Sequence, residues 1–139
     1  MIFWDSSALV ALLVDEADSE PRRQQLQTDS ELAVWWGTSV ECESAIQRRL
    51  REGVLSAADA RLARERLVDL AASWHEVSPV VAVRTLSRRL LRTHPLRAAD
   101  ALQLAAALTL AEAGLNQLSF ACSDVRLAAA CEAEGLHWV

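Results

Sequence analysis

The chain has 139 residues, of which 52% are hydrophobic and 24% charged, with a formal net charge of −5. This composition excludes a disordered chain, and the length suits one domain, residues 1–139, with a core of its own. No apolar run reaches the roughly 20 residues of a membrane span, and the first residues lack the basic segment of a signal peptide, so we expect a cytoplasmic protein without membrane contact.

The first half of the chain alternates apolar strands with helices. IFW (2–4) is a short strand, SSALVALLVDE (6–16) a helix and residues 18–27 a second, polar helix. LAVWW (32–36) is a buried strand that ends at Gly37. TSVECESAIQRRLREG (38–53) is an amphipathic helix with Val40, Ala45, Ile46 and Leu50 on its apolar side and Gly53 at its end.

The second half continues the alternation. Ser56 and Asp59 give the helix of residues 56–74 a capping signature, and HEVSPV (75–80) is a short strand. Helices at 81–93 and 98–113 are separated by HPL, and the first of them places Val83, Leu86, Leu90 and Leu91 on its apolar side. LSFACS (118–123) is a strand, residues 124–135 a helix and LHWV (136–139) a last strand.

Strands that alternate with helices and are apolar throughout indicate a parallel sheet covered on both faces. The sequence therefore predicts an α/β fold in three layers, with about four or five central strands. Cys42, Cys122 and Cys131 lie far apart without metal-ligand spacing and are interpreted as small buried hydrophobic residues.

All fourteen basic residues are arginines. They cluster at 48–51 and at 84–92, with Arg97 after the second cluster. Arginine binds phosphate through two hydrogen bonds, although the 84–92 helix is more simply interpreted as a solvated face.

Four acids occupy matching places, each at the end of a strand or the start of a helix: Asp5, Glu41, Asp100 and Asp124. Carboxylates favour helix N-termini, so each of them can be a helix cap, and Thr38 with Glu41 fits a capping box. Alternatively, the four acids lie together in one crevice. The carboxyl ends of parallel strands share one edge of the sheet, and ligands of open α/β sheets bind there. Clustered carboxylates repel one another unless a hard cation such as Mg²⁺ or Mn²⁺ neutralises them.

Four segments in this order resemble the PIN domain, and within it the VapC-type ribonuclease toxins: IFWDSSALVALLVDE, VWWGTSVECESAI, HPLRAADALQLAAAL and FACSDVRLAAACEAEGL. The resemblance implies a PIN-like three-layer sandwich with metal-binding and catalytic acids at Asp5, Glu41, Asp100 and Asp124. Glu43 is the rival of Glu41; on a helix the two diverge by about 200°, and Glu41 lies nearer the N-terminus, so we prefer Glu41. Ser6, and Cys122 or Ser123, are possible supporting residues.

The resemblance further implies a Mg²⁺- or Mn²⁺-dependent endoribonuclease, in which a metal-activated water attacks an RNA phosphodiester and one of the acids orients that water. It also implies a homodimer and a small antitoxin partner. Arg97 is a candidate phosphate contact, and Trp35 and Trp36 are candidates for base stacking, one of them at least being core. Leu9, Leu12, Leu13 and the two tryptophans either line an antitoxin groove or pack in the core.

Two other functions fit these residues less well. A non-catalytic module with a degenerate PIN fold would not need an intact set of acids. A haloacid-type phosphatase with Asp5 as nucleophile would need a second Asp two residues later and a Lys, whereas this chain has Ser7 and no lysine.

Overall fold

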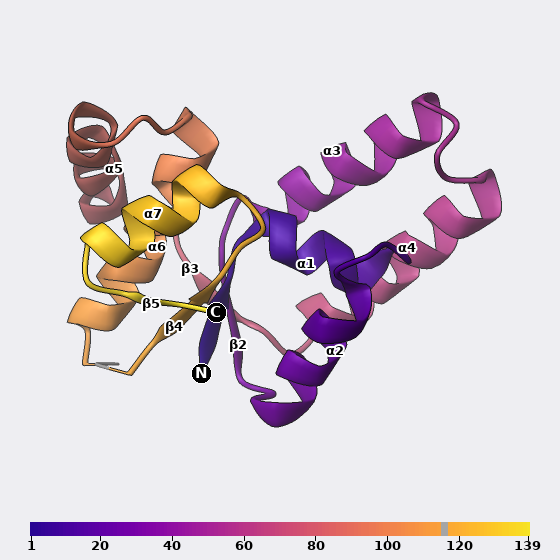
Figure 1. Cartoon of the computed structure of the whole chain (residues 1–139), viewed down its shortest axis with the longest axis horizontal. Helices are drawn as coiled ribbons and strands as arrows, with labels where there is room; N and C mark the ends of the chain where they lie inside the picture. Colours follow the sequence, from indigo (N-terminus) through magenta and orange to yellow (C-terminus); the bar gives the residue numbers. More distant parts are fainter. Residues whose placement is uncertain (115–116) are drawn as a thin grey trace.

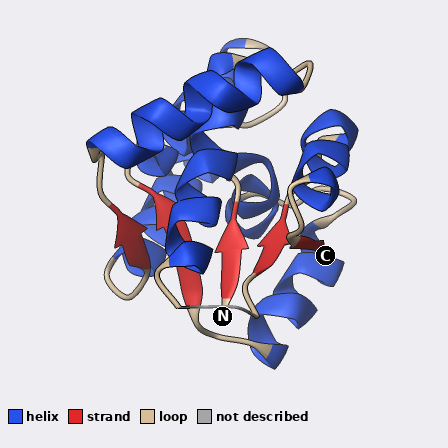
Figure 2. Cartoon of the chain, turned by 90° about the vertical axis from the view of Figure 1, so that its left-hand side faces the viewer, coloured by secondary structure: helices blue, strands red, loops and turns tan. Residues whose placement is uncertain are grey.

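The sheet at the centre of the molecule has five parallel strands in the order β3-β2-β1-β4-β5. The computed structural model describes residues 1–114 and 117–139. The strands are β1 (Ile2–Trp4), β2 (Leu32–Trp35), β3 (His75–Val77), β4 (Ser119–Ala121) and β5 (His137–Trp138). Figure 2 shows neighbouring strands running in the same direction.

Helices cover both faces of this sheet, and they are α1 (Ser6–Leu13), α2 (Ser19–Thr28), α3 (Thr38–Arg51), α4 (Ala57–Ala71), α5 (Val81–Thr93), α6 (Ala98–Glu112) and α7 (Val125–Ala133). In Figure 1, α1 to α4 lie on one side of the strands and α5 to α7 on the other. The predicted three-layer α/β fold is thus confirmed, with element boundaries close to those expected from the sequence.

Alternation along the strands divides the core in two. Phe3 and Phe120 are fully buried and stack with ring centroids 5.5 Å apart on the side of α5, α6 and α7. Trp4 and Val34 point to the opposite face, where they pack with residues of α1, α3 and α4. Both faces of the sheet are therefore excluded from water at its centre, which explains why β1 and β2 are apolar at every position.

The small side chains of α6 allow it to lie close to the sheet. Every residue from Gln103 to Leu108 is buried, and all of them except Gln103 are Ala or Leu. This packing fixes the position of Asp100, in the first turn of the helix. None of the described helices is long and apolar enough to cross a membrane.

Several local predictions were wrong. Gly37, not Thr38, is the N-cap of α3, so Thr38 and Glu41 form no capping box, and Thr38 is buried. Val40 is 67% exposed and Leu91 41% exposed, because the apolar stripes of α3 and α5 are narrower than expected. Helix α4 ends at Ala71 rather than near Trp74.

Candidate functional site

The four acids singled out in the sequence line one cavity of about 580 Å³ at the carboxyl edge of the sheet. Asp5 follows β1 and Asp124 follows β4, the two neighbouring strands at which the strand order reverses. This reversal is the topological switch point at which open α/β sheets bind ligands. Glu41 and Asp100 come to the same cavity from the first turns of α3 and α6.

Asp5 is the most buried of the four, with 3% of the residue exposed. The pKa of its carboxyl group is raised from 3.8 to about 6, chiefly by burial and in smaller part by the charges of Glu41 and Asp100, against the hydrogen bonds from Ser7. The effect of two other acids on Asp5 agrees with their place on the same cavity.

Ser7 ties the two sides of the switch point together. Its hydroxyl donates to Oδ2 of Asp5, and its backbone N–H donates to the same oxygen at 2.9 Å. The Ser7 hydroxyl also accepts the backbone N–H of Ser123 at 2.9 Å. One side chain thus joins the exit of β1 to the loop between β4 and α7.

Glu41 is held by two side chains from other helices. Its Oε2 accepts a hydrogen bond from the hydroxyl of Ser6 at 2.7 Å and from Nε2 of Gln103 at 3.2 Å. Gln103 is fully buried and also donates to the hydroxyl of Thr38 at 3.1 Å. This network fixes the rotamer of Glu41 and positions it beside Asp5.

Glu43 points to a different place. Its Oε1 accepts from Nε of Arg64 on α4 at 3.0 Å and from Gln47 at 2.8 Å. It does not line the cavity. Of the two rival acids on α3, the geometry places Glu41 with Asp5, Asp100 and Asp124.

Helix capping accounts for part of the bonding of Asp5, Asp100 and Asp124, but not of Glu41, whose partners are the side chains of Ser6 and Gln103. Asp5 and Asp124 are the N-caps of α1 and α7; Oδ1 of Asp124 accepts the N–H groups of Arg126 and Leu127 at 2.8 and 3.0 Å. Oδ2 of Asp100 accepts the N–H of Arg97 at 3.3 Å.

In each of the four acids only one carboxylate oxygen accepts hydrogen bonds from residues that the structure describes. Within the described part of the chain, the second oxygen of Asp5, Glu41, Asp100 and Asp124 makes no hydrogen bond. The site therefore offers four carboxylate oxygens without a protein partner, the donor type that Mg²⁺ and Mn²⁺ prefer. As the side chains stand, no three Asp, Glu, His or Cys residues in the described ranges form a ready-made metal site. The donors fit a hard cation in kind.

The predicted supporting residues differ in how they contact the four acids. Ser6 bonds Glu41, whereas Ser123 contributes its backbone N–H to Ser7. Cys122 is buried, and its carbonyl oxygen accepts from Nη2 of Arg22 at 2.8 Å. Arg97 is exposed and does not line the cavity.

Of the two alternatives for Leu9, Leu12 and Leu13, packing in the core is the one observed, since all three are exposed by 8% or less. Trp35 is buried as well, and Trp36 is 53% exposed, as expected for a pair of which at least one is core. All three cysteines are free and buried, as predicted.

Sequence reasoning missed Ser7, Thr38 and Gln103. The available signal for Gln103 was its place as the single polar residue in ALQLAAAL, three residues after Asp100 and thus on the same side of α6.

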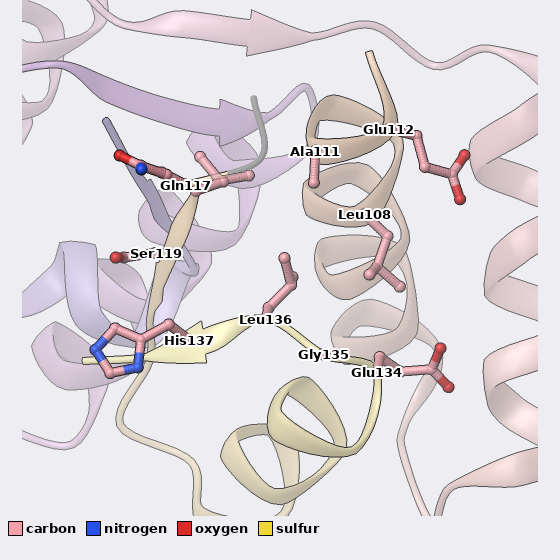
Figure 3. A pocket seen from close by; sticks show the side chains of 10 residues that line it. Leu108, Ala111, Glu112, Gln117, Ser119, Glu134, Gly135, Leu136 and His137 are labelled. Atoms are coloured by element: carbon pink, nitrogen blue, oxygen red, sulfur yellow. The ribbon is translucent and has the colours of Figure 1, made fainter. Parts of the chain in front are cut away.

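A larger cavity, of about 670 Å³, lies at the opposite edge of the sheet, between the end of α6 and β5. Figure 3 shows Leu108 and Leu136 at this cavity, and the carboxylates of Glu112 and Glu134 pointing away from Ser119. Glu134 is bound by Arg89 and by His94, which hold its pKa at about 2. The carboxylate of Glu134 is thus engaged in an ion pair, unlike the carboxylates of Asp5, Glu41, Asp100 and Asp124.

Comparison with solved structures identifies the same fold in other proteins. The chain is similar to PAE2754 from Pyrobaculum aerophilum, with a TM-score of 0.66, 21% identity and coverage of 99% of this chain and 88% of that one. It is similar to a chain of a toxin–antitoxin complex from Klebsiella pneumoniae, with a TM-score of 0.63, 16% identity and coverage of 93% and 91%. FitAcB from Neisseria gonorrhoeae gives a TM-score of 0.66, 15% identity and coverage of 99% and 96%.

The chain has a PIN-like fold. At these identities the likeness extends to the fold alone, and no protein-family model and no curated protein sequence matches the chain. The PIN-like architecture expected from the four sequence segments is thus confirmed, while the chemistry must be argued from the site.

Proposed function

We propose that this PIN-like protein is a Mg²⁺- or Mn²⁺-dependent endoribonuclease that acts as the toxin of a toxin–antitoxin pair. The observation that carries the proposal is the convergence of Asp5, Glu41, Asp100 and Asp124 on one cavity, each with a carboxylate oxygen that no described residue binds. Structural capping alone would not place four acids together, because mutual repulsion disfavours it.

The four acids are the residues that would hold the cation. A bound divalent cation lowers the pKa of a water molecule and neutralises charge on a phosphodiester, which are the two requirements of its hydrolysis. The protein supplies the rest: Ser7 holds Asp5, Ser6 and Gln103 orient Glu41, and the packing of α6 against the sheet fixes Asp100.

The toxin role and the antitoxin partner are supported by the fold shared with the Klebsiella pneumoniae toxin–antitoxin complex. On the surface of this chain, Val40 lines the cavity and is 67% exposed, so an apolar residue is available to a partner beside the acids. A homodimer in the cytoplasm is the assembly expected for such a toxin, and light scattering on the purified chain tests it.

Cleavage of several structured RNAs tests the activity. We expect the wild-type chain to cut RNA with Mg²⁺ or Mn²⁺, and to lose the activity with EDTA or with the substitution Asp5→Ala. Glu65→Gln, on an exposed acid outside the cavity, is the matched control and retains activity. Cleavage that survives both the chelator and Asp5→Ala overturns the proposal, and a wild-type chain that cuts no RNA favours the non-catalytic PIN module.

A further inference from the structure

The cavity that holds the four acids has a second, basic end. Its wall along α3 is formed by Glu41, Ser44, Ala45 and Arg48, with Arg49 and Glu16 beside them. Residues 41 and 48 are seven positions apart, which is about two helical turns or roughly 10 Å along the same helix face. The four acids of the site and the two arginines therefore occupy opposite ends of one depression, with Glu16 beside the arginines.

The two arginines at this end differ in how they are held. Nη2 of Arg49 lies 3.0 Å from Oε2 of Glu16, and Nη1 of Arg49 donates to the carbonyl of Ala45 at 3.4 Å. Arg48 is exposed, and its side chain makes no ion pair or hydrogen bond with any residue of the described ranges. The guanidinium of Arg48 thus keeps all its donors for a ligand, with a second positive group fixed next to it.

The surface between the two ends is small and carries no charge. Ser44 and Ala45 are the residues of α3 that lie between Glu41 and Arg48 on the cavity wall. A ligand can therefore pass along α3 without meeting a bulky side chain. A single small anion would occupy only the end with Arg48 and Arg49. A nucleic acid strand can occupy both ends, because a cation bound by the four carboxylates makes that end suitable for a second phosphate.

We infer that Arg48, supported by Arg49, binds a backbone phosphate of single-stranded RNA, near the phosphodiester that lies at the four carboxylates. The inference rests on the proposed ribonuclease function and adds the direction in which the substrate lies, along α3 away from Glu41. A local contact of this kind is required because the chain carries a net charge of −5 and cannot attract RNA through its overall field. Arginine suits the role because its planar guanidinium binds two phosphate oxygens at once.

Binding of a fluorescein-labelled single-stranded RNA of twelve nucleotides, followed by fluorescence anisotropy at several salt concentrations, tests the inference. The protein carries Asp5→Asn and Mg²⁺ is present, so that RNA is bound without being cut. We expect Arg48→Gln to weaken binding roughly fivefold and to reduce the salt slope by about 0.7, the value for one lost phosphate contact on a single strand. Arg48→Lys keeps the positive charge but cannot bind two phosphate oxygens at once, so we expect its RNA affinity to lie between that of the parent protein and that of Arg48→Gln.

Arg51→Gln is the matched control, because it removes the same charge from the same helix at an exposed position outside the cavity. Its affinity and its salt slope stay close to those of the parent protein. Equal effects of Arg48→Gln and Arg51→Gln on RNA affinity overturn the inference, because the loss of affinity then follows from the lower positive charge of the protein and not from a specific contact.

A second variant tests the supporting role of Arg49 without removing an arginine. Glu16→Gln releases Arg49 from its ion pair, and we expect tighter RNA binding than with Glu20→Gln, which removes a charge from an exposed position outside the cavity. Equal affinities of the two variants contradict the supporting role.

Cleavage by the same variants in the wild-type background separates this inference from the proposed function. If the wild-type chain cuts RNA with Mg²⁺ but Arg48→Gln binds and cuts as Arg51→Gln does, the inference fails and the ribonuclease function stands. If the wild-type chain neither cuts nor binds RNA, both fail together.

Discussion

Gln103, fully buried in α6, donates a hydrogen bond of 3.2 Å to the carboxylate of Glu41 on α3. The helix that carries Asp100 thereby also positions a second acid of the site. Because Gln103 contacts Glu41 through its amide and lies below the surface, it is a positioning residue.

Substitution of Gln103 by Leu should therefore affect both stability and activity. The hydroxyl of Thr38 and Oε2 of Glu41 lose a partner, and leaving buried polar groups unsatisfied costs about 1–3 kcal/mol of unfolding free energy. We expect RNA cleavage to fall about tenfold through kcat, with KM little changed, as Glu41 loses its fixed rotamer. Urea unfolding and steady-state kinetics measure the two effects.

Gln24→Leu serves as the control, since Gln24 is an exposed residue of α2. A Gln103→Leu protein that is destabilised yet cleaves with the wild-type kcat when folded would show that the residue is purely structural.

Metal binding should distinguish Glu41 from Glu43. A cation that binds only the folded protein raises the unfolding free energy by RT ln(1 + [L]/Kd), which is about 1.4 kcal/mol at ten times Kd. We expect Mn²⁺ to raise the Tm of the wild type and of Glu43→Gln, but much less that of Glu41→Gln. Differential scanning fluorimetry with an EDTA reversal measures this, and an equal response of both variants would remove Glu41 from the metal site.

The buried carboxyl of Asp5 should make stability depend on pH. Its pKa is raised from 3.8 to about 6 in the folded protein, so the folded state binds more protons than the unfolded state between these values. Without metal, the unfolding free energy of the wild type therefore falls as the pH rises from 4 to 6. Above pH 6 the contribution of Asp5 no longer changes. Asp5→Asn removes the dependence and should be more stable at pH 7, by up to about 3 kcal/mol for a shift of roughly two units.

Urea unfolding of the wild type and of Asp5→Asn at a series of pH values, in EDTA, measures this difference. A difference between the two proteins that does not change between pH 4 and pH 6 would contradict the burial of an ionised Asp5.

The three cysteines should be unreactive in the folded protein. Burial raises the pKa of the Cys42, Cys122 and Cys131 thiols to about 12, so that roughly one in ten thousand is ionised at pH 8. We expect no rapid reaction with a thiol-specific disulfide reagent under native conditions, and reaction of all three thiols in guanidinium chloride. Fast labelling of one thiol without denaturant would show that its surroundings open locally.

The parts of this molecule that were predictable from sequence are those set by neighbouring residues. Strand ends and helix starts are local properties, so the positions of Asp5, Glu41, Asp100 and Asp124 at one edge followed from the alternation of strands and helices. The parallel sheet followed in the same way, from the alternation of helices with strands, of which β1 and β2 are apolar at every position.

Ser6 was predicted as a supporting residue, but the contacts of Gln103 and Ser7 across the site were not predictable, because they join distant segments. Gln103 and Glu41 are 62 positions apart, and Ser7 and Ser123 are 116 apart. Val40 was misplaced for a related reason: its exposure depends on the cavity beside α3 rather than on the helical period.

The bond from Ser123 to the hydroxyl of Ser7 has a consequence for access to the site. The loops after β1 and β4 cannot move apart without breaking this bond and loosening the bond from Ser7 to Asp5. The Ser7 hydroxyl, together with the bond from the N–H of Asp5 to the carbonyl of Ala121 at 2.9 Å, thus holds the two sides of the carboxylate end together. A ligand that reaches the four carboxylates without breaking these bonds therefore enters through the opening that the folded structure already has.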